Sequence, residues 1–229
     1  MTIEQLIDTS LLPDGTVQNG ICVPYGTIPF WFLNDDLKED ELERQIEDFY
    51  QKGISGIMLH PRCYIPETLQ YMSDRYLELC RFATECAAKR NMKVVLYDEA
   101  MYPSGSAHGA VVAENSDFSA RGLGMYKMSE YIAEDTDSVV AYYGEDLSVT
   151  DKENAVYVVT ERYSGGTARG IHEGEDDGQP FAPKSSDLLN PAAVKCFIKH
   201  THEKYYSALK DYFGSTIIAF FTDEPSIMG

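Results

Sequence analysis

Thr216-Ile217-Ile218-Ala219-Phe220-Phe221-Thr222-Asp223-Glu224-Pro225 is an apolar run that ends abruptly in two acids and a proline. Its β-branched and aromatic residues are typical of a buried parallel strand. Such a strand delivers the side chains at its C-terminal end to one rim of the sheet, where functional sites form. The stretch therefore predicts a strand that places Asp223 and Glu224 in a site.

Three similar apolar runs lie upstream, at residues 28–33, 56–60 and 93–97. Helical spacing of apolar residues predicts helices over about 40–53 and 67–89 between them, and a third over about 191–213 before the last strand. Strands that alternate with helices are typical of βαβ units and a parallel sheet. We therefore predict an α/β fold that forms a partial (β/α)8 TIM barrel, with about four of the eight βα units.

This alternation is interrupted between the third strand and the last helix. Residues 125–128, 139–143 and 155–160 alternate like antiparallel strands, and residues 164–187 are rich in Gly, Asp and Ser. We predict an N-terminal arm at 1–27 and a partial barrel domain at 28–229, with a β insertion at about 123–187. An open half-barrel exposes sheet edges, so we expect it to associate with a missing C-terminal half of the barrel or with itself. The alternative is a complete small α/β domain that closes in another way.

Composition narrows the class of protein. The 229 residues include 19 basic and 37 acidic side chains, a net charge of 19 − 37 = −18, which disfavours nucleic acid and anionic membranes as partners. The 5 cysteines are an odd number without CxxC spacing, so free thiols are expected. The sequence shows neither a signal peptide nor an apolar run of about 18 residues, and a cytoplasmic location is expected.

Polar residues follow each predicted strand, where a barrel would gather them on one rim. They are Asn34, Asp35 and Asp36; His60, Arg62 and Tyr64; Asp98, Glu99, Tyr102 and Ser104; and Asp223 and Glu224. The alternative is that some acids cap the helices that follow, above all Asp35 and Asp36. Trp31, the only tryptophan, lies near the end of the first strand, and we favour a role in the site over the alternative of ordinary core packing.

Side-chain alternation favours Glu224 over Asp223 as the acid in the site. Glu224 shares a strand face with the small Thr222, which suits a crowded barrel interior, whereas Asp223 sides with Phe221, which suits the helix-facing side. Glycoside cleavage requires one protonated carboxyl group and a second carboxylate. An aromatic, partly dry rim favours the acid form that the first role requires.

Several stretches together resemble a group of bacterial glycoside hydrolases related to family 106, the α-L-rhamnosidases. The most specific are Tyr102-Pro103-Ser104-Gly105-Ser106 and Phe220-Phe221-Thr222-Asp223-Glu224-Pro225, and Pro29-Phe30-Trp31-Phe32-Leu33-Asn34, Leu188-Leu189-Asn190-Pro191 and Thr201-His202-Glu203-Lys204-Tyr205-Tyr206 also match. The resemblance implies a TIM barrel with the acid/base glutamate at Glu224. It also implies a second carboxylate from a later strand, so we expect this chain alone to be inactive. Calcium is implied by the resemblance only, and no motif places a ligand for it, so no cofactor is predicted.

The sequence thus predicts a glycosidase fragment in which Glu224 is the general acid. The residues expected to line the sugar site are Trp31, Asn34, His60, Arg62, Asp98, Glu99, Tyr102 and Asp223. One alternative is a carbohydrate-binding fragment without catalysis. Another is a metal-dependent barrel hydrolase with His60 and Asp98 or Glu99 as ligands.

Overall fold

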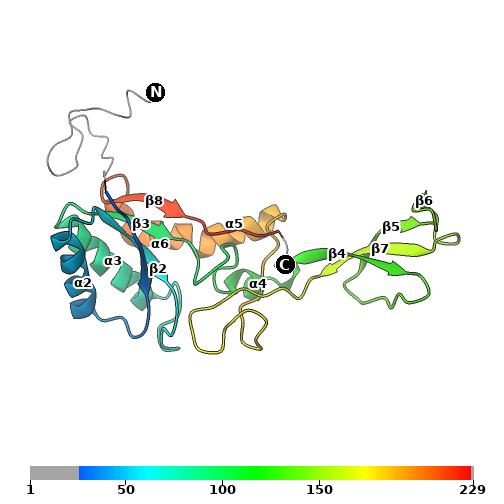
Figure 1. Cartoon of the computed structure of the whole chain (residues 1–229), viewed down its shortest axis with the longest axis horizontal. Coiled ribbons are helices and arrows are strands. Elements are labelled where there is room, and N and C mark those ends of the chain that lie inside the picture. The colour runs from blue at the N-terminus through cyan, green and yellow to red at the C-terminus, as the bar shows by residue number, and fades with distance from the viewer. Residues whose placement is uncertain (1–25, 228–229) are drawn as a thin grey trace, which may run out of the picture.

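The run that precedes Asp223 forms β8 (Ile217–Phe221), an edge strand of a four-stranded parallel sheet (Figure 1). The strand order is β1-β2-β3-β8, with β1 at Phe30–Leu33, β2 at Gly56–Pro61 and β3 at Lys93–Tyr97. The structure is a computed structural model that describes residues 26–227, so nearly all of the predicted arm at 1–27 lies outside the described residues. The four predicted strands are confirmed, and neighbours in the sequence are neighbours in the sheet.

Three helices pack on one face of this sheet: α2 (Glu39–Gln51), α3 (Asp74–Ala88) and α6 (His202–Leu209). The core between them contains Ile46, Tyr76 and Tyr205 from the helices and Leu59 and Leu96 from the strands, all fully buried. The opposite face carries a smaller cluster, Met58, Val95 and Tyr97 with Ile28 and Phe221 beside it, to which no helix contributes. The sheet therefore has one covered face and one open face in the part of the chain that is described.

The second helix begins later than the predicted residue 67. Its N-cap is Ser73, whose Oγ accepts a hydrogen bond from the Tyr76 amide at 3.3 Å. The residues before it form turns, in which the amides of Leu69 and Ser73 bond the carbonyls of Pro66 and Gln70. The first amides of a helix have no partner within the helix, and a serine side chain three residues earlier can accept from one of them. Here Ser73 does so and fixes the start of the helix.

The helix predicted over 191–213 is divided at Thr201 into α5 (Pro191–His200) and α6, followed by the 3-10 turn η2 (Lys210–Tyr212). Thr201 has a non-helical backbone (φ −120, ψ −79), and its Oγ1 donates to the Phe197 carbonyl at 2.8 Å. Hydroxyl bonds of this kind compete with the helix ladder. The predicted start is confirmed, because the Asn190 side chain caps Ala192 and Pro191 occupies the first turn.

A β-bulge in β8 overturns the predicted facing of its last residues. Val94 pairs with Ile217 but Val95 pairs with Ala219, so Ile218 is an extra residue in β8. Phe220 therefore packs on the helix side, 6.1 Å from the Tyr205 ring, and Phe221 faces the open side. The prediction that Phe221 faces the helices, made from its bulk, was wrong. Asp223 shares the open side with Phe221 through its bond to Tyr97, whereas Thr222 bonds Asp98, so the alternation argument that favoured Glu224 over Asp223 is reversed.

The predicted β insertion forms a second, antiparallel sheet of order β4-β7-β5-β6, which projects away from the parallel sheet (Figure 1). Its strands are β4 (Arg121–Lys127), β5 (Ser138–Tyr143), β6 (Val149–Thr150) and β7 (Tyr157–Tyr163). Short helical turns precede it, α4 (Ala110–Glu114) and η1 (Ser116–Phe118). Residues Arg121 and Tyr163 pair with each other, so the chain enters and leaves this sheet at one place.

Two expectations from composition concern the whole chain. Cys63, Cys80, Cys86 and Cys196 are free, as predicted, and Cys22 lies outside the described residues. Among residues 26–227, no helix combines the length and the apolar character that a membrane crossing requires.

Candidate functional site

The loop after β3 is folded around the carboxylate of Glu99, which is 1% exposed. Its Oε2 accepts hydrogen bonds from the amides of Gly105, Ser106 and Ala107 at 3.1, 2.8 and 2.7 Å. Its Oε1 accepts from the amides of Ala100 and His108 at 2.9 and 2.6 Å. Burial raises the pKa of Glu99, and these amide bonds oppose that rise.

The prediction that Glu99 lines a sugar site was wrong for the described structure. Both of its oxygens are occupied by backbone amides, and the side chain is buried beneath the loop that it organises. A carboxylate with five amide donors holds a loop in place rather than meeting a ligand.

Asp98 is also buried, at 0% exposure, and joins the ends of β3 and β8. Its Oδ1 accepts from Ser104 Oγ and its Oδ2 from Thr222 Oγ1, both at 2.6 Å. His202 Nε2, on α6, lies 3.5 Å from Oδ2. Burial raises the pKa of Asp98, although the two hydroxyl bonds lower it. Asp98 therefore supports the strand ends from the helix side and does not reach the open face.

Asp223 lies on the open side and is held by three hydrogen bonds. Tyr97 Oη donates to Asp223 Oδ2 at 2.6 Å. The Asp223 amide donates to Ser104 Oγ, and the Ser104 amide donates to the Asp223 carbonyl, each at 2.8 Å. Because Thr222 is bonded to Asp98 as well, both residues before Glu224 are anchored.

Glu224 follows these anchored residues and is exposed, with a left-handed backbone (φ 41). Within residues 26–227 its side chain has neither a hydrogen bond nor an ion pair. A non-glycine residue in this conformation changes the direction of the chain at the strand end. The carboxylate is thus presented beyond the sheet and is not packed against it.

The open side of the sheet carries a group of rings that we call the aromatic face: Phe30, Phe32, His60, Tyr97 and Phe221. His60 stacks on Tyr97 with 3.6 Å between ring centroids, and Phe221 also stacks on Tyr97, with 6.0 Å between centroids. Phe30 and Phe32 remain 43% and 46% exposed. The Arg62 guanidinium lies 4.7 Å from the centroid of Phe32 and adds a charged group to this face.

His60 is a neutral member of the aromatic face. Burial, with the nearby charge of Arg62, lowers its pKa to about 4. Its Nε2 lies 3.3 Å from the Met101 carbonyl, and its Nδ1 is buried without a partner among the described residues. The acceptor on Nδ1 is not open to solvent, because His60 is 1% exposed.

Three predicted site residues lie elsewhere or have another role. Trp31 is 5% exposed on the helix-covered face, where its Nε1 donates to Gln45 Oε1 at 2.8 Å and its ring contacts Phe49 edge-on, so the prediction that it has a role in the site was wrong. Asn34 is exposed, and its Oδ1 accepts from the Cys63 amide at 3.0 Å. Tyr102 is half-buried, with the guanidinium groups of Arg62 and Arg169 5.8 and 5.7 Å from its ring centroid.

The sequence did not predict that Tyr97 bonds Asp223. It also did not predict that Thr222 and Ser104 bond Asp98. All three residues lie close in sequence to the acids at the predicted strand ends, and this proximity was the signal that could have identified them. Nor did the sequence predict a role for His172 and Glu175, which lie in the loop after β7.

Neither cluster of metal-ligand atoms found among the described side chains has the all-oxygen donor set that calcium prefers. Ca²⁺ takes about 6–8 oxygen ligands. Two groups of three ligand atoms occur in the described chain, His108 with His172 and Glu175, and Glu114 with Cys196 and His200, and each contains nitrogen or sulfur. His60 belongs to neither group, so the alternative of a metal held by His60 with Asp98 or Glu99 is not supported by the geometry.

A groove of about 390 Å³ lies between α3 and α6 on the helix-covered side. It is lined by Leu77, Arg81, Lys204 and neighbouring residues. None of the residues at the strand ends contributes to it, so we place the candidate site at the aromatic face and the end of β8 and not in this groove.

The described chain is a mixed α/β protein with one parallel and one antiparallel sheet. Neither a protein-family model nor a curated protein matches it. A rhamnosidase from Novosphingobium sp. PP1Y is similar over 52% of this chain and 10% of its own length, with 13% identity and a TM-score of 0.34. A cyclic α-maltosyl-(1→6)-maltose hydrolase from Arthrobacter globiformis is similar over 93% of this chain and 47% of its own, with 14% identity and a TM-score of 0.31. The chain thus spans about a tenth of the rhamnosidase and about half of the maltose hydrolase.

Proposed function

We propose that this chain carries the proton-donating part of a glycoside hydrolase site, with Glu224 as the general acid. The observation that carries the proposal is the set of hydrogen bonds that anchors Thr222 and Asp223 and leaves the carboxylate of the next residue, Glu224, exposed at the end of β8. A general acid needs a fixed backbone and a carboxyl group that can reach the leaving oxygen.

The arrangement of the sheet supports a barrel as the surrounding fold. All three long helices that contact the sheet lie on one face, and strand order follows chain order. A doubly wound sheet places helices on both faces and reverses strand order at its switch point, whereas each βα unit of a barrel adds the next strand in the same direction. The four units fit part of a (β/α)8 barrel, and the open face corresponds to its interior.

The aromatic face supports a sugar as the ligand. Phe30 and Phe32 expose ring surface next to the neutral His60 and the charged Arg62. Ligand sites commonly combine apolar ring surface with a few polar groups that fix orientation. Arg62 and Asp223 are the polar groups that we assign to substrate binding, the buried His60 supports the face by stacking on Tyr97, and Tyr102 and Asn34 shape the loops around them.

The catalytic role of Glu224 can be tested with leaving groups of different acidity. The natural protein that contains this sequence is assayed on matched 4-nitrophenyl and 2,4-dinitrophenyl glycosides, with and without the substitution Glu224→Gln. A general acid is needed less when the leaving group is already a weak base. We expect Glu224→Gln to reduce kcat/KM about 100-fold or more on the poorer leaving group and much less on the dinitrophenyl compound.

Equal losses on both glycosides, or no loss, would remove Glu224 from the acid role. Asp223→Asn is the matched comparison, because Asp223 precedes Glu224 and is tied to Tyr97. Sugar binding without turnover in the natural protein would support the alternative of a carbohydrate-binding protein.

A further inference from the structure

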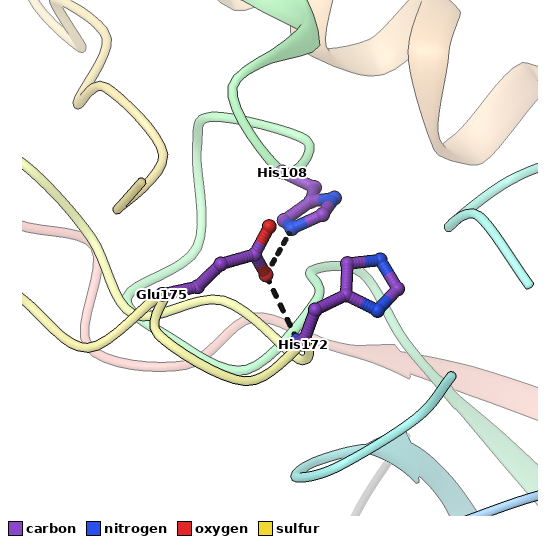
Figure 2. Close-up of side chains that lie close together, drawn as sticks. All are labelled: His108, His172 and Glu175. Atoms are coloured by element: carbon purple, nitrogen blue, oxygen red, sulfur yellow. Dashed lines mark hydrogen bonds and ion pairs between the residues drawn. The ribbon is translucent and has the colours of Figure 1, made fainter. Parts of the chain in front are cut away.

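Two histidines and a glutamate from separate loops meet beside the loop that Glu99 organises (Figure 2). His108 follows β3, and His172 and Glu175 lie in the segment that returns from the antiparallel sheet. His108 Nε2 is 2.8 Å from Glu175 Oε2, and the His172 amide donates to the same oxygen at 2.9 Å. One ligand atom from each of the three residues lies within 4.8 Å of the others.

The surroundings of His172 fix which of its nitrogens is free. His172 Nδ1 lies 2.8 Å from the Ile65 carbonyl oxygen, which can only accept, so Nδ1 carries the proton. His172 Nε2 is then an acceptor, and it is buried without a partner among the described residues. The residue is 8% exposed, so water does not readily satisfy this nitrogen. An imidazole that donates one N–H to a carbonyl and keeps the other nitrogen free is the arrangement of a metal-binding histidine.

We propose that His108, His172 and Glu175 bind one divalent transition-metal ion, with Zn²⁺ as the cation that the donor set favours. Two imidazole nitrogens and one carboxylate oxygen match a tetrahedral Zn²⁺ site that keeps a fourth position for water. Bonds of about 2.0–2.2 Å to Zn²⁺ require ligand atoms closer together than 4.8 Å, so the side chains would move together when the ion binds. His108 Nε2 then binds the metal through its lone pair, and that ring carries its proton on Nδ1.

The position of Glu175 suits this role. Its Oε2 lies 2.8 Å from His108 Nε2 and accepts from the His172 amide at 2.9 Å, so the carboxylate already faces both histidine residues. A carboxylate binds a metal ion in its ionised form.

The second group of ligand atoms, Glu114 with Cys196 and His200, fits a metal less well. Glu114 is exposed, and the Lys199 ammonium lies 2.9 Å from its Oε2. A cation already neutralises that carboxylate, whereas no lysine or arginine is paired with Glu175 in the described chain.

The metal would fasten the return segment of the insertion to the loop after β3. His108 is held on Glu99 through its amide at 2.6 Å, and the Ile65 amide donates to the Ile171 carbonyl at 3.1 Å. The ion would thus link two loops directly, and the loop after β2 would be joined to them through the hydrogen bonds of Ile65 to Ile171 and His172. This proposal goes beyond the proposed glycosidase and does not depend on it.

The test uses the purified chain after removal of metals with a chelator. Isothermal titration with Zn²⁺ is expected to show one ion per chain, while Ca²⁺ and Mg²⁺ bind weakly or not at all. His172→Phe, His108→Gln and Glu175→Gln are each expected to weaken Zn²⁺ binding more than about 10-fold. His200→Gln, in the second group, is the matched control and is expected to leave the affinity unchanged. X-ray absorption of the Zn²⁺ form should show two imidazoles and oxygen ligands.

Circular dichroism and thermal unfolding without metal show whether each variant still folds. The expected result is that folded variants lose the increase in melting temperature that Zn²⁺ gives to the unchanged chain. Absence of Zn²⁺ binding to the unchanged chain, or equal affinity in the three variants and the control, would overturn the proposal.

Discussion

Tyr97 Oη donates a 2.6 Å hydrogen bond to Asp223 Oδ2, and this bond joins the ends of two adjacent strands, β3 and β8. Burial raises the pKa of Tyr97, with a further rise from Asp223, so the phenol stays a donor. The carboxylate of Asp223, the residue directly before Glu224, is therefore oriented by a rigid ring on the neighbouring strand.

Replacing Tyr97 with Phe removes this donor and keeps the ring. We expect the free energy of unfolding to fall by about 1 kcal/mol, as for loss of one hydrogen bond, and kcat/KM on aryl glycosides to fall about 10-fold as Asp223 loses its orientation. Urea unfolding and steady-state kinetics of the natural protein measure the two effects. Tyr206→Phe, at a 58% exposed position, is the control. Unchanged kinetics in Tyr97→Phe would show that the bond is structural only.

Glu99→Gln tests whether the loop after β3 depends on a carboxylate. An amide side chain has one acceptor oxygen, so it cannot accept all five backbone N–H groups. We expect a loss of about 2–4 kcal/mol in the free energy of unfolding, because buried amides are left unpaired. Chemical denaturation measures it, and exposed Glu153→Gln is expected to change stability by less than about 0.5 kcal/mol. Equal stabilities would contradict this account of the loop.

His60 makes stability depend on pH. Its pKa is about 4 in the folded chain because burial disfavours the charged ring, and about 6.5 in the unfolded chain. Between these values the unfolded chain binds the extra proton, so stability falls as pH decreases from 6.5 to 4 and is unaffected by His60 above that window. The full loss is about 3 kcal/mol at 1.36 kcal/mol per pH unit.

Denaturation of the unchanged chain and of His60→Phe at several pH values measures this contribution. The variant is expected to keep the ring packing against Tyr97 and to show a shallower fall in stability with decreasing pH. Part of the fall should remain, because burial also lowers the pKa of His202. Identical slopes in the two proteins would rule out His60 as the source.

Phe32 and Trp31 provide a contrast between the two faces of one strand. Phe32→Ala, on the open side, should weaken sugar binding about 10-fold, seen as an increase in KM, with less than about 1 kcal/mol lost in stability. Trp31→Phe, on the covered side, should lower stability by about 2 kcal/mol and leave KM unchanged. The opposite pattern would place the sugar on the other face.

Local chemistry made much of the fold predictable. Four apolar runs gave the four parallel strands, and Asn190 with Pro191 gave the start of α5, because capping and burial act within a few residues. The break at Thr201 and the bulge at Ile218 depend on competition between nearly equal backbone arrangements and on the register of the neighbouring strand. A single sequence carries no separate signal for either.

The candidate site was less predictable than the fold. Acids at strand ends were found, but their exposure depends on loops folded over them, which buried Asp98 and Glu99. The face of Trp31 depended on where α2 packs, since both faces of β1 carry aromatic rings. His172 and Glu175 come from a segment without periodicity, and only the tertiary fold brings them to His108.

The pairing of Arg121 with Tyr163 has a consequence for how this protein could change over evolution. Because the projecting antiparallel sheet begins and ends at one pair of neighbouring residues, it is an insertion joined to the rest of the chain at a single place. Its length and sequence can vary, or the piece can be exchanged, without moving the strands that hold Tyr97 and Asp223. The return segment with His172 and Glu175 lies after that pair of residues, so it would be kept when the antiparallel sheet is exchanged.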